Sequence, residues 1–135
     1  MADWKMMSDF SIALPDRPGE LARLAARMRE ADVNLLGLWG YGSSSQTARF
    51  YCVPESADQF RNFAESAGLE VQEGTTFFLT GRDRGGALVE RLDRIALQGI
   101  NLHAIEAIRV GDQFGCFIWA DAADWPRLAE ALDQG

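Results

Sequence analysis

Residues 16–35 read DRPGELARLAARMREADVNL, and residues 83–102 read DRGGALVERLDRIALQGINL. The second stretch begins 67 positions after the first (16 to 83), and the two align without a gap. The identical pairs are Asp16/Asp83, Arg17/Arg84, Gly19/Gly86, Leu21/Leu88, Arg27/Arg94, Asn34/Asn101 and Leu35/Leu102. The same register continues to Phe10/Phe77 before these stretches and to Gln46/Gln113 and Phe50/Phe117 after them. Because the copies share a turn before the helix and an Asn after it, they indicate an internal duplication.

The first copy lies in a run of expected elements that begins with a strand. Phe10, Ile12 and Leu14 alternate with small residues, which predicts a strand that ends near Pro15. Pro18 suits the first position of a helix. The apolar face of that helix consists of Leu21, Leu24, Ala25 and Met28. Strands are expected over residues 33–41, 47–53 and 69–73, with a second helix over residues 56–68. This β-α-β-β-α-β order predicts the ferredoxin-like α+β fold.

The second copy repeats this order but stops before its last strand. Strands are expected over residues 75–81, 100–110 and 114–120, with helices over residues 85–99 and 123–133. The remaining Gln134 and Gly135 cannot form another strand. The second unit is therefore expected to lack one edge strand, unless the N-terminal DWKMM or another chain supplies it. We predict two units in tandem, over residues 1–74 and 75–135.

The composition excludes several classes of protein. The net charge is −7 and no basic block occurs, so the surface repels phosphate backbones and no nucleic-acid partner is expected. No apolar run approaches the roughly 18 residues of a membrane span. The N-terminal MADWKMMSDF lacks the basic and then apolar pattern of a signal peptide. With 47% apolar residues, the chain is expected to form a packed core and to work in the cytoplasm.

Few residues offer catalytic chemistry. Lys5 is the only lysine and lies in the N-terminal arm, which argues against a phosphate-binding loop and a lysine Schiff base. No set of nucleophile, base and orienting group can be assembled. Cys52 and Cys116 lie one in each half; two such ligands cannot close a zinc site, so buried free thiols are expected. Neither an enzymatic activity nor a metal or cofactor is expected.

The duplicated pattern resembles a known family. D-R-P-G-x-L, followed by a helix and then V/I-N-L at the start of a strand, is similar to the ACT domain, a small ferredoxin-like module that binds amino acids and related ligands. DRPGEL…DVNL matches closely, whereas DRGGAL…GINL departs by Gly85 in place of proline. The resemblance covers both halves, from Phe10 to about Asp133. It implies a ligand between two units, with the strand-to-helix loop of one facing the Asn of the other.

Carried over to this chain, the resemblance pairs the loop Asp16–Gly19 with Asn101, and the loop Asp83–Gly86 with Asn34. The ligand-binding residues that it implies are Asp16, Arg17, Pro18, Gly19, Asn34, Leu35, Asp83, Arg84, Gly85, Gly86, Asn101, Leu102 and His103. A helix start presents unpaired N–H groups and a positive dipole end, which favour a carboxylate. Glycine admits a ligand close to the backbone, and an Asn amide both donates and accepts. The two sites are expected to be unequal, because Glu20 in the first helical turn corresponds to Ala87.

Some of these residues have a purely structural alternative. Asp16 and Asp83 can cap their helices, and an Asn after a helix can also be a cap. His103, the only histidine, is either a ligand contact or an ordinary strand residue. These alternatives stay open at the level of the sequence.

Apolar residues also occur on the strand face expected to point away from the helices. Leu36 and Leu38 alternate with Val33 and Leu35, which are expected to face the helices. In the second half, Ile105, Cys116 and Ile118 repeat this outer pattern. A sheet with one wet face should alternate cleanly, so the second face is expected to be covered. Two chains stacked sheet to sheet, as a homodimer, would cover it.

The residues and the resemblance together predict a non-enzymatic regulatory protein that senses a free amino acid. With no effector domain expected in the chain, its allosteric output would pass through another protein or through oligomeric state. The alternative is a regulatory or interaction subunit that pairs with a metabolic enzyme and binds no ligand itself. A small enzyme on the same scaffold is a third possibility, which the lack of a catalytic constellation disfavours.

Overall fold

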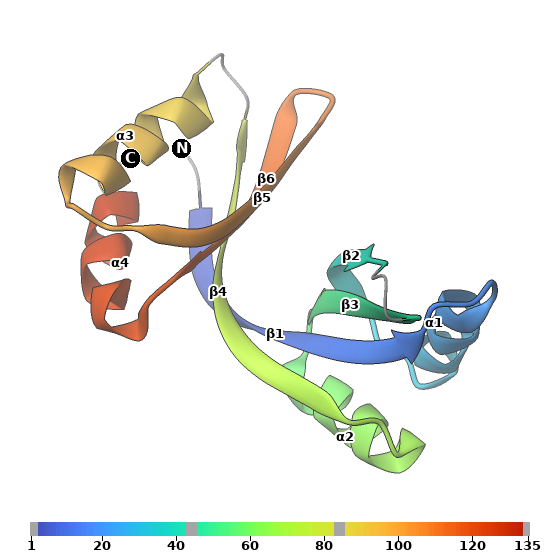
Figure 1. Cartoon of the computed structure of the whole chain (residues 1–135). Helices are drawn as coiled ribbons and strands as arrows, with labels where there is room; N and C mark the ends of the chain where they lie inside the picture. Colours follow the sequence, from blue (N-terminus) through green and yellow to red (C-terminus); the bar gives the residue numbers. More distant parts are fainter. Residues whose placement is uncertain (1–2, 43–45, 83–85, 134–135) are drawn as a thin grey trace. The chain divides into compact units, whose positions relative to one another are not determined.

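The computed structural model describes residues 3–42, 46–82 and 86–133 of the chain. Its elements are, in order, β1 (Asp3–Pro15), α1 (Glu20–Glu30), β2 (Leu35–Tyr41), β3 (Thr47–Pro54), α2 (Ala57–Ala67), β4 (Val71–Arg82), α3 (Ala87–Leu97), β5 (Leu102–Val110), β6 (Gln113–Ala120), η1 (Ala122–Asp124) and α4 (Trp125–Asp133). Figure 1 shows these elements, whose strands are hydrogen-bonded in the order β2-β3-β1-β4-β6-β5. The predicted α+β class with ferredoxin-like units in tandem is confirmed.

The chain divides into two compact units. Met7–Gly74 forms one, here called the N-terminal unit, and Met1–Met6 with Thr75–Gly135 forms the other, the C-terminal unit. The division falls inside β1 and inside β4, because both are long continuous strands. The sequence predicts separate strands over residues 69–73 and 75–81, and this prediction is wrong, since β4 runs through both.

The N-terminal unit has one hydrophobic core between its sheet and two helices. Phe10 and Ile12 of β1 meet α1 and α2 on one face of the sheet. Apolar residues recur at helical spacing in both helices, so each helix buries a single stripe. The buried helix residues are Leu24 and Met28 of α1, and Phe60, Phe63 and Ala64 of α2. These contacts place the β1–α1 loop at one end of α1 and the start of β2 at the other.

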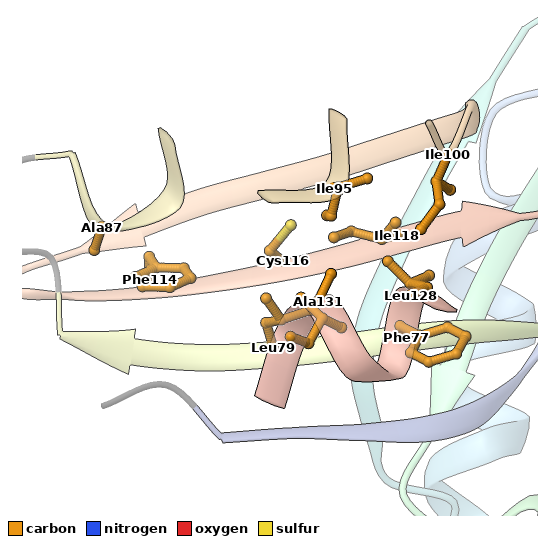
Figure 2. Close-up of a cluster of buried hydrophobic side chains, with 11 residues drawn as sticks. Phe77, Leu79, Ala87, Ile95, Ile100, Phe114, Cys116, Ile118, Leu128 and Ala131 are labelled. Atoms are coloured by element: carbon orange, nitrogen blue, oxygen red, sulfur yellow. The ribbon is translucent and has the colours of Figure 1, made fainter. Parts of the chain in front are cut away.

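The C-terminal unit repeats this arrangement with α3 and α4. Figure 2 shows its core, in which side chains of β4 and β6 meet those of the two helices. Phe77 and Leu79 come from β4, and Cys116 and Ile118 come from β6. All four are almost fully buried. The duplication is therefore visible in the packing as well as in the sequence.

The N-terminal segment completes the C-terminal unit. After α4 the described chain ends at Asp133, so the expected lack of a last strand holds for the described residues. β1 begins at Asp3 and lies beside β4 in the strand order. Trp4 packs against the core of the C-terminal unit, stacks on Phe77 with ring centroids 5.5 Å apart, and donates a hydrogen bond of 2.7 Å from Nε1 to Asp133 Oδ1. Of the two sources considered for the missing edge strand, DWKMM is the one found.

The helix starts differ from the sequence-based expectation in one respect. α1 begins at Glu20 and its N-cap is Gly19, so Pro18 lies before the helix and not at its first position. Gly19 has φ +88° and Gly86, the N-cap of α3, has φ +84°. This left-handed conformation lets the chain turn from strand into helix, and glycine adopts it without steric cost. The turn chemistry is thus duplicated together with the helices.

The expected outer faces of β2 and β5 are wrong. Leu38 pairs with Cys52, which pairs with Phe10, so Leu38 shares the face that carries the helices. Ile105 pairs with Ile118, and Cys116 and Ile118 are buried in the core on the helix side. The reason is a register shift early in each strand, between Leu35 and Gly37 in β2 and between Leu102 and Ala104 in β5. One extra residue moves every later side chain to the opposite face.

One pair in the sequence alignment of the two copies is also wrong. Phe50 pairs with Ile12, whose equivalent Leu79 pairs with Cys116. Phe50 therefore corresponds to Cys116 (66 positions later), and not to Phe117. The hairpin that joins the second and third strands is one residue shorter in the second copy. Phe117 lies on the face opposite the helices, where it stacks on Phe78 at 4.8 Å.

The two thiols are buried and unpaired with each other, as predicted. Burial raises the pKa of Cys52 from 9.0 to about 12, helped by the charge of Asp9. Burial alone raises the pKa of Cys116 to about 12. Folding favours the protonated form of both thiols, because their pKa is higher in the folded chain. Their contribution to the free energy of unfolding is therefore fully present below pH 9.0 and is lost as the pH rises through about 12.

We expect both thiols to resist alkylation in the folded protein. A pKa of about 12 in place of 9.0 reduces the thiolate fraction roughly a thousandfold at mildly alkaline pH, and burial slows access of the reagent further. Iodoacetamide labelling followed by mass spectrometry should show no modification until denaturant unfolds the chain. Rapid labelling of either cysteine under native conditions would contradict their burial in the two cores.

Candidate functional site

The β1–α1 loop borders a cavity of about 450 Å³, lined by Pro15, Asp16, Arg17 and Gln46. The backbone N–H of Asp16 donates to the carbonyl of Gln46 at 2.8 Å, which ties the loop to the start of β3. The N–H of Arg17 donates to the carbonyl of Pro15 at 2.9 Å. Asp16 is exposed and does not cap α1, because no side chain caps that helix. The capping alternative for Asp16 is therefore wrong.

Charged side chains gather at the start of α1. Glu20 Oε2 lies 3.0 Å from Arg17 Nη2 and 3.0 Å from Arg23 Nη2. The hydrogen bond from Arg23 lowers the pKa of Glu20 below its ordinary value; burial opposes this effect, and the hydrogen bond from Arg17 adds a smaller lowering. Arg23 also folds back over Gly19, where an added Cβ would lie 3.1 Å from Arg23 Nη1. The first loop thus has an acidic side chain held between two guanidinium groups.

The second loop is described only from Gly86 onward. Asp83, Arg84 and Gly85 lie outside the described residues. Ala87, which is buried, opens α3 in the position of Glu20. Arg91 is 5% exposed, and its Nη1 donates to the carbonyl of Ala87 at 2.8 Å. A buried guanidinium in the first turns of α3 adds positive charge near this helix start, which the sequence pattern did not predict.

Asn34 and Asn101 lie immediately before β2 and β5, and both are exposed. The carbonyl of Asn34 accepts a 2.9 Å hydrogen bond from the N–H of Glu55. Neither residue is a helix cap, because the C-cap of α1 is Ala31 and that of α3 is Gln98. Within the described ranges, neither side-chain amide makes a hydrogen bond. The capping alternative for these Asn residues is wrong, and their amides are available to a ligand.

The following leucines have a different place. Leu35 packs against the core of the N-terminal unit and Leu102 against that of the C-terminal unit. Both are half-buried, so their side chains chiefly stabilise the units. They hold the preceding Asn residues in position at the start of each strand.

The loop and the Asn of one copy cannot contact the same small ligand. α1 has 11 residues, and at about 1.5 Å rise per residue it is roughly 16 Å long. Asp16–Gly19 precedes this helix and Asn34 follows it. A bound amino acid is much shorter than this separation, so a site that uses both kinds of residue needs more than one copy of the pattern.

His103 has a partner of its own. Its Nε2 lies 3.1 Å from Asp121 Oδ1, and its side chain is 51% exposed. It lies in the irregular stretch of β5 between Leu102 and Ala104. This contact joins β5 to the segment before α4, because His103 lies in β5 and Asp121 lies in that segment. It favours the purely structural role of His103, one of the two roles that the sequence left open.

A second cavity in the N-terminal unit does not involve the predicted residues. It measures about 840 Å³ and is lined by segments of β1, α2 and β4, with Arg49 from β3. Arg61 lies at its edge, bound to Glu73 through bonds of 2.6 and 2.9 Å and to Asp58 at 2.6 Å. No sequence motif marks these residues, because the pairing of Arg61 with Glu73 depends on the fold of the unit. The charge of Arg61 is thus compensated by acidic side chains of the same chain.

The described residues contain little that could catalyse a reaction or bind a metal. No group of three or more His, Cys, Asp or Glu residues in these ranges could hold a metal ion. The two thiols are buried and protonated. None of the helices in the described ranges is both long enough and apolar enough to span a membrane.

Comparisons with known proteins identify the fold. The sequence matches no protein-family model and no curated protein. Protein BT0572 from Bacteroides thetaiotaomicron has a similar structure, with a TM-score of 0.83 and 14% identity over 97% of this chain and 89% of that one. The ligand-free regulatory subunit of aspartate kinase from Thermus thermophilus gives 0.68 and 14% over 98% and 95%. The corresponding subunit from Thermus flavus gives 0.57 and 14% over 99% and 94%.

At these low identities the similarity establishes the fold. The predicted resemblance to ACT-domain proteins is confirmed at this level, because the similar structures include regulatory subunits built on the same fold. Nearly the whole of each chain is covered, so the tandem arrangement is shared as well.

Proposed function

We propose that this chain is a non-enzymatic cytoplasmic regulatory protein that binds a free amino acid through its two strand-to-helix loops. The observation that carries the proposal is the duplicated helix start. Gly19 and Gly86 both adopt the left-handed conformation, and among the described residues no side chain caps either helix. Within these residues the first N–H groups of each helix are therefore not used by a capping side chain, and they lie at the positive end of the helix dipole. This arrangement suits an α-carboxylate.

Asn34 and Asn101 supply the second half of the proposed recognition. Each amide is exposed and can accept from an ammonium group or donate to a carboxylate. An amino acid carries both groups on one carbon, so a helix start and an Asn amide each match one of its two charges. A thermal-shift screen of the common amino acids tests the proposal, and a screen in which none of them stabilises the protein would contradict it.

A second function, that of an interaction subunit for a metabolic enzyme, is supported by the exposed edge of the C-terminal unit. β5 is the last of the described strands in the strand order, so within the part of the chain that the structure describes one of its edges has no neighbouring strand. Ile108 is 68% exposed and Val110 is 72% exposed. A long apolar edge strand is a ready template for pairing with another chain. Co-purification of a larger enzyme polypeptide, with no response to any amino acid, would favour this function.

The same edge supports the proposed homodimer. Ile108 pairs with Gly115 on the face opposite the helices, so its side chain is not needed by the core of the unit. We expect light scattering to give twice the chain mass of 14.9 kDa at micromolar concentration. Ile108→Lys should shift the protein toward the monomer while changing the melting temperature little. Val89→Lys, which also replaces an exposed apolar residue, is the matched control on α3. A monomeric parent protein would contradict the homodimer.

A further inference from the structure

The sheet of the C-terminal unit has a second face, which lies opposite α3 and α4 and is here called the outer face. Phe77 and Ile118 pair with each other and are buried in the core against the helices. The neighbouring residues Phe78 and Phe117, which also pair with each other, therefore point the other way. Their rings stack with centroids 4.8 Å apart, and the ring of Trp119 lies 6.2 Å from that of Phe117. The centre of the outer face is thus aromatic.

Opposite charges lie on the two sides of this aromatic centre. Glu106 of β5 pairs with Phe117, so it lies on the outer face at one side. Trp4 of β1 packs into the core, so the next residue, Lys5, belongs to the outer face at the other side. There Lys5 borders a cavity of about 250 Å³ together with Phe78. Because the strand order is β1-β4-β6-β5, the face has a lysine, then two phenylalanines, then a glutamate.

Within one chain, the two charges are far apart. Three spacings between neighbouring strands separate β1 from β5, which puts the backbones of Lys5 and Glu106 at least about 14 Å apart. A carboxylate accepts from several donors, so contacts of Glu106 inside its own chain do not prevent a further one. The other charged side chains that the described strands carry on this face are Asp3, at the start of β1, and Arg82, at the end of β4, which lies 3.9 Å from Asp112.

We propose that the homodimer forms by packing of two outer faces about a twofold axis that runs along the strands. This axis reverses the strand order in the second copy, so Lys5 of each chain lies over Glu106 of the other and the aromatic centres meet. An axis across the strands would instead bring like charges together. Closed twofold dimers with one self-complementary surface are the commonest oligomers. The inference rests on the proposed homodimer and assigns the surface that forms it.

The size of the outer face is sufficient for such a dimer. Four strands span about 19 Å, and the eight residues of β6 span about 27 Å, so the face covers roughly 500 Å². Two facing surfaces of this size bury roughly 1,000 Å², the area at which stable interfaces begin. Ile108 and Val110, which pair with Gly115 and Gln113 on the same face, are 68% and 72% exposed and add apolar area.

Charge reversal, followed by analytical ultracentrifugation at low salt, tests this arrangement. Lys5→Glu places like charges together at both symmetric contacts, and so does Glu106→Lys. Each variant alone should raise the dissociation constant of the dimer roughly tenfold or more, because attraction becomes repulsion twice. Neutral substitution of either residue should change the constant little, since an exposed ion pair is weak. Glu90→Lys makes the same charge change on the exposed side of α3 and should leave the constant as it is in the parent.

An equimolar mixture of Lys5→Glu and Glu106→Lys separates contacts between chains from contacts within one chain. In the mixed dimer both contacts again join opposite charges, so the mixture should dimerise about as tightly as the parent protein. High salt should bring each single variant close to the parent, because it screens exposed charges. Far-UV circular dichroism checks that each variant is folded, and Glu106→Arg provides the same reversal with a second side chain.

The outcomes distinguish the assigned surface from the homodimer itself. A mixture that dimerises no better than the single variants would mean that the two charges do not meet between chains, and the outer-face arrangement would be overturned. Dimers unchanged in both single variants would also overturn it, while the homodimer would stand with the edge of β5 as its contact. A monomeric parent protein would remove the homodimer and this inference together.

Discussion

Trp4→Ala is expected to lower the free energy of unfolding by about 3 kcal/mol, the lower end of the range for removing a large aromatic side chain from a core. Trp4 is only half-buried, which argues for the lower end. The substitution removes the stack on Phe77 and the packing against the core of the C-terminal unit. It also removes the 2.7 Å hydrogen bond to Asp133, which lies at the end of α4. A segment 129 positions away in the sequence would thereby lose its attachment.

Two further variants make this result specific. Trp4→Phe keeps a stacked ring but loses the indole N–H. It should lower the free energy of unfolding by about 1 kcal/mol more than a substitution at an exposed position does. Lys5→Ala changes the next residue of β1, which is exposed, and should stay within about 0.5 kcal/mol of the parent. Urea unfolding followed by circular dichroism measures all three. A Trp4→Ala variant as stable as Lys5→Ala would mean that the N-terminal segment does not complete the C-terminal unit.

The order of elements could be predicted from the sequence because its signals are local. Alternation over Phe10–Leu14 and helical spacing over Leu21–Met28 each lie within one element, and each was confirmed. The continuity of β4 was missed because Gly74 reads as a break between two strands. In the structure Gly74 stays in the strand, where an added Cβ would lie 3.0 Å from Asp9 Oδ1. A glycine that lets another side chain approach a strand closely cannot be distinguished from a turn glycine by sequence alone.

The faces of β2 and β5 were missed for a different reason. A β-bulge leaves no clear mark in composition, yet it reverses the inside and outside of every later residue. Leu38 and Ile105 were therefore assigned to an outer face, whereas both lie on the face that carries the helices. The bulges occur at equivalent places in both copies, so they are shared features of the repeat. The homodimer proposal now depends on Ile108 and Val110 instead.

Part of the candidate site could be read from the sequence. The two glycines before the helices are part of the duplicated loop, although Pro18 lies two positions before the first helical residue and not at it. The ion pairs of Glu20 with Arg17 and Arg23 were not predicted, although the spacing of these residues by three is a local signal that could have indicated them. The contact between His103 and Asp121 depends on how β5 and the segment before α4 come together, which no local pattern encodes.

Addition of the correct amino acid is expected to raise the melting temperature by roughly 5–13 °C. A ligand that binds only the folded chain stabilises it by about 2.7 kcal/mol at one hundred times its dissociation constant. For a chain of this size, each kcal/mol corresponds to roughly 2–5 °C. The screen needs millimolar concentrations of each common amino acid, since exposed sites bind weakly. A shift of this size is well above the scatter of a dye-based melting assay.

Substitution of the two Asn residues then separates binding from stability. Loss of one amide that contacts a charged group costs about 1.5–3 kcal/mol, a tenfold weakening or more. Asn34→Ala and Asn101→Ala should each weaken binding to this extent, while the melting temperature without ligand stays near that of the parent, because neither residue caps a helix. Asn62→Ala, on the exposed side of α2, is the matched control and should bind normally. If both Asn variants bind the amino acid as well as Asn62→Ala does, the Asn amides are not part of the site. If no amino acid shifts the melting temperature of the parent protein, an interaction subunit becomes the better account of the duplicated fold.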